Sequence, residues 1–114
     1  MYEFQLANKV NNAIQDICSR FNFRKVTRIL LKAGAMRKIN PELTAFIFSS
    51  ISEGTPAEGA IFSVMFVPTT FRCHSCGQMW TTESADFMCA FCGSRDVDLL
   101  TGLELSIDFV EVEG

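Results

Sequence analysis

Apolar residues recur at steps of three and four in the first part of the chain. Between residues 4 and 21 this spacing is carried by Leu6, Val10, Ile14, Ile17 and Phe21. The period predicts an amphipathic helix with one apolar face. Cys18 lies beside that face, so we interpret it as a buried helix residue rather than a metal ligand or a nucleophile.

A strand is predicted after this helix. Residues 26–32 are rich in β-branched and aliphatic side chains that alternate in part with polar ones, and Gly34 closes the segment. Such a run is typical of a strand, here with Arg28 and Lys32 on the solvent face.

A second helix is predicted to begin at Pro41. The Asn40 side chain can accept hydrogen bonds from backbone N–H groups of the first turn, and Pro41 has no N–H to leave unpaired. Glu42 adds a negative charge at the positive end of the helix dipole. The helix is expected to stop near Gly54, with side chains at helical spacing at Leu43, Phe46, Ile47 and Ile51 or Ser50.

Two further strands flank a segment of different character. Residues 60–67 predict an apolar strand that ends at Pro68, because proline has no donor for a β-ladder. Residues 70–99 hold the paired cysteines and few aliphatic side chains, which predicts an insert without a conventional core. A half-buried last strand, with a bulge or twist at Phe109–Val110, is predicted from alternating Leu103, Leu105, Ile107 and Phe109.

Four of the five cysteines form two C-x-x-C-G motifs separated by 12 residues: Cys73 and Cys76 before Gly77, then Cys89 and Cys92 before Gly93. Two cysteines three positions apart in a tight turn can direct both sulfurs at one ion. The glycine that follows permits positive φ and lets backbone N–H groups approach the thiolates. Two such turns complete a closed tetrahedral sulfur shell, which indicates structural zinc.

The spacing leaves other chemistries open. A rubredoxin-like iron centre uses the same spacing, and a pair of disulfides also fits it. A thioredoxin-type redox pair is disfavoured, because the two motifs occur together and neither begins a helix after a strand. His74, the only histidine, is interpreted as an exposed residue, with exchange for a cysteine ligand as the alternative. Trp80 and Phe87 are expected to pack over the zinc turn.

The elements together predict an α+β fold, with a three-stranded mixed sheet and two helices on one of its faces. Residues 1–68 and 100–114 are expected to form this domain, and residues 69–99 an inserted tetracysteine zinc ribbon. Since four ligands fill the zinc shell, we expect zinc to stabilise the fold rather than to act in catalysis.

The composition excludes several classes of protein. Hydrophobic residues make up 48% of the 114 residues and charged residues 20%, which favours a globular domain over a disordered chain. The net charge of -3 argues against nucleic acid as a partner. No apolar run approaches the roughly 20 residues that span a bilayer, and no signal-peptide pattern is present, so we expect no membrane contact and a cytoplasmic location. The sequence holds no catalytic triad, phosphate-binding loop or carboxylate pair, so no enzyme is expected.

Further motifs follow one another along the chain. Glu3 opens the first helix, G-x-x-x-x-x-N-P-E-L covers residues 34–43, T-P-A-E-G-A covers residues 55–60, and G-x-E-L-x-I covers residues 102–107. With the two cysteine motifs, this order resembles the hydrogenase maturation factor HypA family over essentially the whole chain. The resemblance implies a nickel domain with a zinc ribbon inserted before the last strand. It also implies nickel transfer to the large subunit of nickel–iron hydrogenase together with a maturation GTPase; some members also serve urease.

The N-terminus departs from the family pattern. Family members begin Met-His-Glu and hold nickel through the second-position imidazole and nearby backbone nitrogens, with the glutamate close by. Here Tyr2 stands in place of that histidine. By resemblance, the nickel ligands that remain are the Met1 amine, the backbone nitrogens of Tyr2 and Glu3, and the Glu3 carboxylate. A phenol with a pKa near 10 must lose a proton to bind, and Asn40 stands where the family often has an acidic residue. We therefore expect weaker nickel binding than in the family generally.

Two functions follow from these observations. The first is a hydrogenase maturation factor that carries nickel as transient cargo and contains structural zinc. The alternative is a divergent relative that does not bind nickel and acts as a zinc-ribbon protein-interaction module. The partners that the resemblance implies are the maturation GTPase and the hydrogenase large subunit, and a homodimer is left open.

Overall fold

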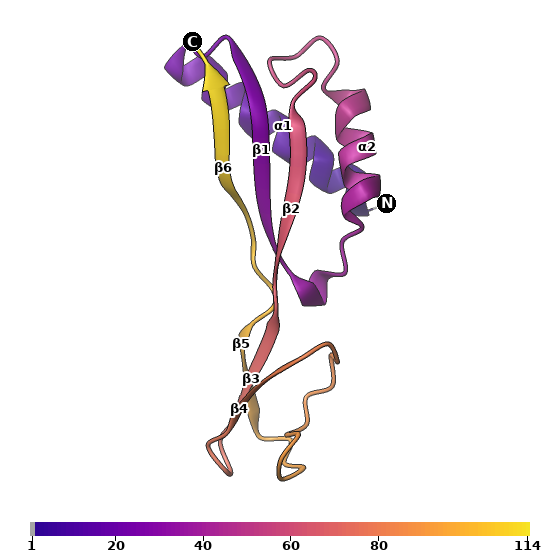
Figure 1. Ribbon diagram of the computed structural model, residues 1–114, viewed down its shortest axis with the longest axis vertical. Coiled ribbons are helices and arrows are strands. Elements are labelled where there is room, and N and C mark those ends of the chain that lie inside the picture. Colours follow the sequence, from indigo (N-terminus) through magenta and orange to yellow (C-terminus); the bar gives the residue numbers. More distant parts are fainter. Residues whose placement is uncertain (1) are drawn as a thin grey trace. The chain divides into compact units, whose positions relative to one another are not determined.

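The computed structural model describes residues 2–114 and divides them into two compact units. The first contains the described residues through Leu31, Ile39–Met65 and Ser106–Gly114; the second contains Lys32–Lys38 and Phe66–Leu105. The elements in Figure 1 are α1 (Tyr2–Phe21), β1 (Lys25–Gly34), α2 (Pro41–Ile51), β2 (Ile61–Val67), β3 (Thr69–Cys73), β4 (Met79–Thr82), β5 (Val97–Thr101) and β6 (Leu105–Glu113), with a 3-10 turn at Ala35–Arg37.

The first unit is built on a three-stranded mixed sheet of order β2-β1-β6. Strands β1 and β6 are antiparallel: the Gly34 N–H donates to the Glu104 carbonyl (2.7 Å) and the Thr27 hydroxyl donates to the Glu111 carbonyl (3.3 Å). Helix α2 connects β1 to β2, as expected for a crossover between parallel strands. This architecture confirms the predicted α+β fold with two helices.

The helices pack on each other and on the sheet. The predicted apolar face of α1 is confirmed at Leu6, Val10, Ile14 and Cys18, which are buried, whereas Phe21 is exposed. In α2, Phe48 is buried and stacks on Phe62 of β2 with ring centroids 5.0 Å apart. The core of this unit therefore lies between the helices and the central strand β1, which buries Val26, Ile29 and Leu31 there.

The start of α2 is as predicted, but part of its buried face is not. The Leu43 N–H donates to Oδ1 of Asn40 at 3.0 Å, so Asn40 is the N-cap. Phe46 is 69% exposed, and the buried positions are Thr44 and Phe48. Helical spacing permits burial of either the face with Phe46 or the face with Thr44 and Phe48, and α2 packs on α1 through the second face. The buried Thr44 hydroxyl donates to the Asn40 carbonyl (2.8 Å).

The last strand is more exposed than its alternation predicts. Leu103, Leu105 and Phe109 are exposed, and Leu103 precedes β6 rather than lying in it. The half-buried positions are Ile107, Val110 and Val112, and their parity changes between Ile107 and Val110, where the break was predicted.

The second unit contains an antiparallel sheet of order β4-β3-β5 with its own small core. Phe71 is fully buried and lies opposite Trp80 in the β3–β4 ladder. The two rings stack with their centroids 5.5 Å apart, and the Phe87 ring meets the Phe71 ring edge-on with a centroid distance of 4.9 Å. The buried apolar residues between positions 70 and 99 are Phe71, Cys73 and Cys89, so the insert has an aromatic cluster but buries no aliphatic side chain. Its core is made of aromatic rings brought together by strand register, which aliphatic periodicity does not reveal.

A close backbone approach joins the turn after β1 to the start of the last strand. A Cβ on Gly34 would overlap the backbone of Gly102, and the Met36 N–H donates to the Gly102 carbonyl at 3.0 Å. Glycine at position 34 is thus required by packing in this unit. Over residues 2–114, no helix is long and apolar enough to cross a membrane.

Candidate metal centre

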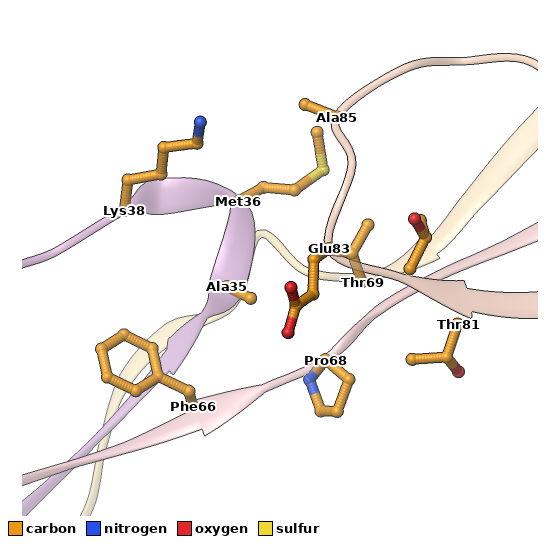
Figure 2. Close-up of a pocket in the computed structure, with 10 residues that line it drawn as sticks. Ala35, Met36, Lys38, Phe66, Pro68, Thr69, Thr81, Glu83 and Ala85 are labelled. Atoms are coloured by element: carbon orange, nitrogen blue, oxygen red, sulfur yellow. The ribbon is translucent and has the colours of Figure 1, made fainter.

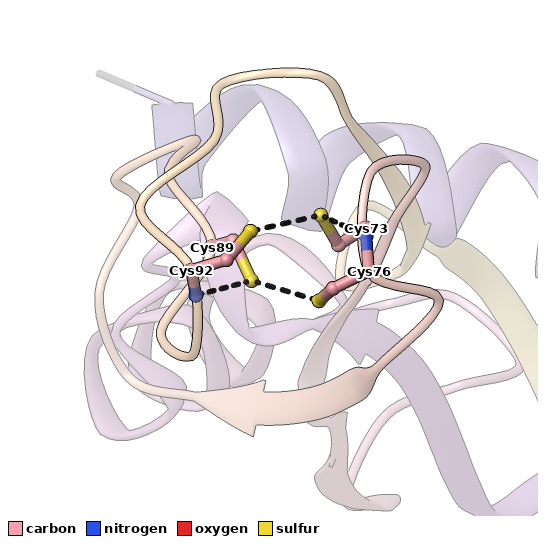
Figure 3. A group of neighbouring side chains, drawn as sticks. All are labelled: Cys73, Cys76, Cys89 and Cys92. Atoms are coloured by element: carbon pink, nitrogen blue, oxygen red, sulfur yellow. Dashed lines mark hydrogen bonds between the residues drawn. The ribbon is translucent and has the colours of Figure 1, made fainter.

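The two cysteine motifs meet at one point of the second unit (Figure 3). Cys73 ends β3 and Cys76 lies in the turn before β4, while Cys89 and Cys92 lie in the segment between β4 and β5. The four Sγ atoms all lie within 4.8 Å of one another. The Sγ atoms of Cys73 and Cys92 are 3.7 Å apart, and so are those of Cys76 and Cys89.

These distances fit a tetrahedral metal ion. Sulfurs at the usual zinc–sulfur distance of about 2.3 Å occupy the corners of a tetrahedron with edges of about 3.8 Å. A disulfide requires about 2.05 Å, and all five cysteines are free thiols in this structure. The donor set and its spacing are therefore compatible with zinc.

Both motifs form the same turn. The Gly77 N–H donates to the Cys73 carbonyl and the Gly93 N–H donates to the Cys89 carbonyl, each at 3.0 Å. Both glycines have positive φ, +78° and +77°, which a side chain would strain. The glycine after each cysteine pair thus allows the turn that directs two sulfurs to one point.

Backbone N–H groups favour the thiolate form of the two buried cysteines. The Cys76 N–H lies 3.5 Å from Sγ of Cys73 and lowers the pKa of that thiol. Desolvation by itself raises the pKa of Cys89, but the N–H groups of Cys92 and Phe91, at 3.4 and 3.3 Å, oppose it and the pKa falls to about 6. Since a metal binds the thiolate, these N–H groups prepare the site for a cation.

The other predicted residues of the ribbon lie around the cluster. His74 is exposed and its Nε2 lies 2.6 Å from a carboxylate oxygen of Asp98. The Trp80 ring meets the Phe91 ring edge-on with a centroid distance of 6.3 Å, so Trp80 packs against the second cysteine turn. Phe87 packs on Phe71 instead. Sequence reasoning missed Phe91 and Phe71; the signal for Phe91 was its position between Cys89 and Cys92.

The N-terminal residues lie in another unit and at the start of α1. Met1 lies outside the described residues. Tyr2 is exposed, and Glu3 is half-buried with its carboxylate accepting the N–H of Asn40 at 3.2 Å. The structure therefore brings Glu3 to the N-terminus of α2, a relationship that the sequence did not predict. Cys18 is buried in α1, as predicted, and burial raises its pKa.

A cavity of about 450 Å³ lies elsewhere in the second unit (Figure 2). In the view of Figure 2, the Glu83 carboxylate lies between Ala35 and Pro68, with Met36 and Phe66 nearby. No cysteine lines this cavity, so its donors do not form part of the metal centre.

Comparison with known proteins identifies the family. The family model described as "Hydrogenase/urease nickel incorporation, metallochaperone, hypA" matches residues 1–112. The chain belongs to the HypA family. The family resemblance inferred from the motifs is thereby confirmed, and the HypA family consists of metallochaperones rather than enzymes.

Individual HypA proteins match over most of their length. The hydrogenase maturation factor HypA of Acidithiobacillus ferrooxidans is 31% identical over 113 residues, covering 99% of this chain and 100% of that protein. HypA of Trichormus variabilis is 39% identical over 89 residues, 78% of each chain.

Solved HypA structures share the fold. The solution structure of the Ni metallochaperone HypA from Helicobacter pylori matches with a TM-score of 0.66 and 17% identity over 97% of each chain. A second solution structure of a HypA protein has a TM-score of 0.72 and 18% identity, and covers 98% of this chain and 96% of that one.

Proposed function

We propose that this chain is a nickel metallochaperone that helps to insert nickel into the large subunit of nickel–iron hydrogenase, with zinc as a structural ion. The observation that carries the proposal is the tetrahedral spacing of four sulfurs in a chain of the nickel-incorporation family. The proposed partners are the maturation GTPase and the hydrogenase large subunit, and the proposed location is the cytoplasm. The proposed domains are residues 1–68 with 100–114 and residues 69–99.

Cys73, Cys76, Cys89 and Cys92 are the proposed zinc ligands. Four thiolates fill a tetrahedral shell, so zinc there leaves no open position for water or substrate. The ion would cross-link the two turns and contribute its binding energy to the fold of the second unit. This role fits a unit whose aromatic core is small.

Nickel, the cargo, is proposed to bind at the N-terminal residues, by resemblance to the family. The donors would be the Met1 amine, the backbone nitrogens of Tyr2 and Glu3, and the Glu3 carboxylate. The first N–H groups of a helix have no intrahelical acceptor, so helix formation does not compete for the nitrogens of Tyr2 and Glu3. The Glu3 carboxylate also accepts the Asn40 N–H, which fixes its position beside α2.

Tyr2 favours a second candidate function. A neutral imidazole binds nickel readily, whereas a phenol must first be deprotonated, with a pKa of about 10. A chain without this imidazole could retain the fold and the zinc ribbon and act as a protein-interaction module. The two functions differ in a single measurable property, the affinity for nickel.

Isothermal titration of zinc-loaded protein with nickel separates the two. The proposal predicts one nickel per chain, bound more weakly than in a Tyr2→His variant. Asn12→His, which places an imidazole at an exposed position in the middle of α1, is the control and should leave the affinity unchanged. No nickel binding by the natural chain, with a tight site in Tyr2→His, would instead support the interaction module.

A further inference from the structure

The cavity of the second unit is lined mainly by apolar side chains (Figure 2). Its volume is about 450 Å³, and small-molecule sites usually have roughly 300–1,000 Å³. The turn after β1, the junction of β2 with β3, and the end of β4 with the loop that follows all contribute to it. The apolar residues are Ala35, Met36, Phe66, Pro68 and Ala85. In a hollow of this kind the few polar groups determine which class of ligand fits.

The Glu83 carboxylate is the charge that faces this hollow. Glu83 lies in an exposed loop, yet Figure 2 shows its carboxylate between Ala35 and Pro68. Within residues 2–114, no side chain forms an ion pair or a hydrogen bond with this carboxylate. Lys38 is the other charged residue of the lining, and in the same view its ammonium points away from Glu83. The negative charge in the cavity is therefore not compensated by the protein.

Two hydroxyl groups accompany the carboxylate. Thr81 and Thr82 at the end of β4 also line the cavity. The Thr82 hydroxyl oxygen accepts the Ser84 N–H at 2.9 Å, and the Thr81 hydroxyl shares a hydrogen bond of 3.2 Å with Thr70. A hydroxyl oxygen has two lone pairs, so the Thr82 oxygen can accept a second hydrogen bond. The polar side of the cavity therefore offers acceptors together with a negative charge, which suits a cationic donor.

We propose that this cavity binds a small organic cation, a primary amine on an apolar alkyl stem. The ammonium has three N–H donors and no acceptor, so it can donate to the Glu83 carboxylate and to a threonine hydroxyl. The stem lies against the apolar walls, where the unbranched and flexible Met36 side chain can adapt to its length. The net charge of -3 also favours the approach of a cation over that of an anion.

A metal ion suits this cavity less well. Within the part of the chain that the structure describes, the group of three or more possible metal ligands is the cysteine cluster, and Glu83 does not belong to it. A single carboxylate among apolar side chains cannot supply the several oxygen ligands that a hard divalent cation requires. An organic cation needs one charged partner and apolar contacts, and the lining provides both.

Titration of ¹⁵N-labelled, zinc-loaded protein with n-hexylammonium chloride, followed by amide NMR, tests the proposal. The amide signals of Met36, Thr82 and Glu83 should shift in a saturable manner. Hexanol has the same stem without the charge, so its dissociation constant should be roughly tenfold higher or more, and hexanoate should cause no saturable shift. Nα-acetyl-lysine N-methylamide, which carries the same ammonium on a peptide unit, should bind more weakly than hexylammonium, because its amide groups would lose water against apolar walls.

Two variants change the cavity in different ways. Glu83→Gln removes the charge and should increase the hexylammonium dissociation constant roughly tenfold or more. Ala85→Phe keeps every charge but places a ring in the cavity, and it should abolish the saturable shifts. Asp86→Asn is the matched control: it removes a negative charge from the same loop at a position that does not line the cavity, so it should leave the dissociation constant unchanged. Zinc content and circular dichroism should be the same in all three variants.

Several outcomes would overturn the proposal. One is a set of shifts that do not saturate or that are scattered over the acidic positions of the chain, as in non-specific ion pairing. Equal affinity for hexanol and hexylammonium, or equal effects of Glu83→Gln and Asp86→Asn, would remove the role of the carboxylate. Tighter binding of the lysine analogue would identify the occupant as a lysine of another protein rather than a free amine.

Discussion

The carboxylate of Glu3 accepts a hydrogen bond from the backbone N–H of Asn40 at 3.2 Å, so the starts of the two helices are joined through residues 37 positions apart. Asn40 also caps α2 through its side chain. One hydrogen bond therefore connects a proposed nickel donor, Glu3, to the N-cap of the second helix, Asn40. Changes at Glu3 or Asn40 should affect nickel binding and stability to different extents.

Glu3→Gln is predicted to lower nickel affinity with little loss of stability. The amide oxygen of glutamine can still accept the Asn40 N–H, but the negative charge that binds nickel is gone. We expect the nickel dissociation constant to increase roughly tenfold, in parallel titrations of the variant and the natural chain. An unchanged dissociation constant would remove the Glu3 carboxylate from the proposed nickel ligands.

Asn40→Ala is predicted to destabilise the protein by about 1 kcal/mol, because the Leu43 N–H loses its acceptor. Asn40→Asp keeps an oxygen acceptor at the same position and should change the stability little. Urea unfolding followed by circular dichroism measures both. Equal losses for the two variants would show that the cap hydrogen bond is not the cause.

Removal of zinc is predicted to unfold the cysteine turns and expose Trp80, the only tryptophan. Trp80 stacks on Phe71 and contacts Phe91 in the second turn, so its emission should shift to longer wavelength when a chelator removes the ion. Cys89→Ser should give the same emission without a chelator. Cys18→Ser serves as the control, since Cys18 is not in the cluster, and it should retain one zinc per chain.

Phe71→Ala is predicted to weaken zinc binding although Phe71 touches no metal. Truncation of a fully buried phenylalanine typically costs about 3–5 kcal/mol, and here it removes the ring on which Trp80 and Phe87 pack. Phe91→Ala removes a ring that is 63% exposed and should cost much less. Competition with a chromophoric zinc chelator compares the two affinities. Equal zinc affinities in the two variants would contradict a structural link between the aromatic core and the ion.

The stability of the fold should fall at alkaline pH through Cys18. Burial raises the pKa of this thiol above that of the unfolded chain, about 8.5, so the folded state holds the proton more tightly. The Cys18 thiol therefore adds to the free energy of unfolding fully below its unfolded-state pKa, and this stabilisation is lost as the pH rises through its folded-state pKa. Unfolding free energies measured upward from about pH 8 should therefore fall more steeply for the natural chain than for Cys18→Ala. Parallel curves would contradict this assignment.

Local chemistry made much of the fold predictable. The α2 start depends on Asn40, Pro41 and their neighbours, and the cysteine turns depend on residues three positions apart, so both could be predicted from short segments. Phe46 and Phe48 have the same helical propensity and differ only in what packs against them, so tertiary contacts decided between them. The contact between Glu3 and Asn40 joins residues far apart in the sequence, and the core around Phe71 joins residues without a regular spacing. Hydrophobic periodicity along the sequence therefore cannot predict either of them.

X-ray absorption at the zinc edge, on protein whose metal content has been quantified, tests the central claim most directly. The account predicts one zinc per chain, surrounded by four sulfurs at about 2.3 Å from Cys73, Cys76, Cys89 and Cys92. Protein that contains no zinc and has disulfides among these cysteines, or that holds iron at the site, would contradict it.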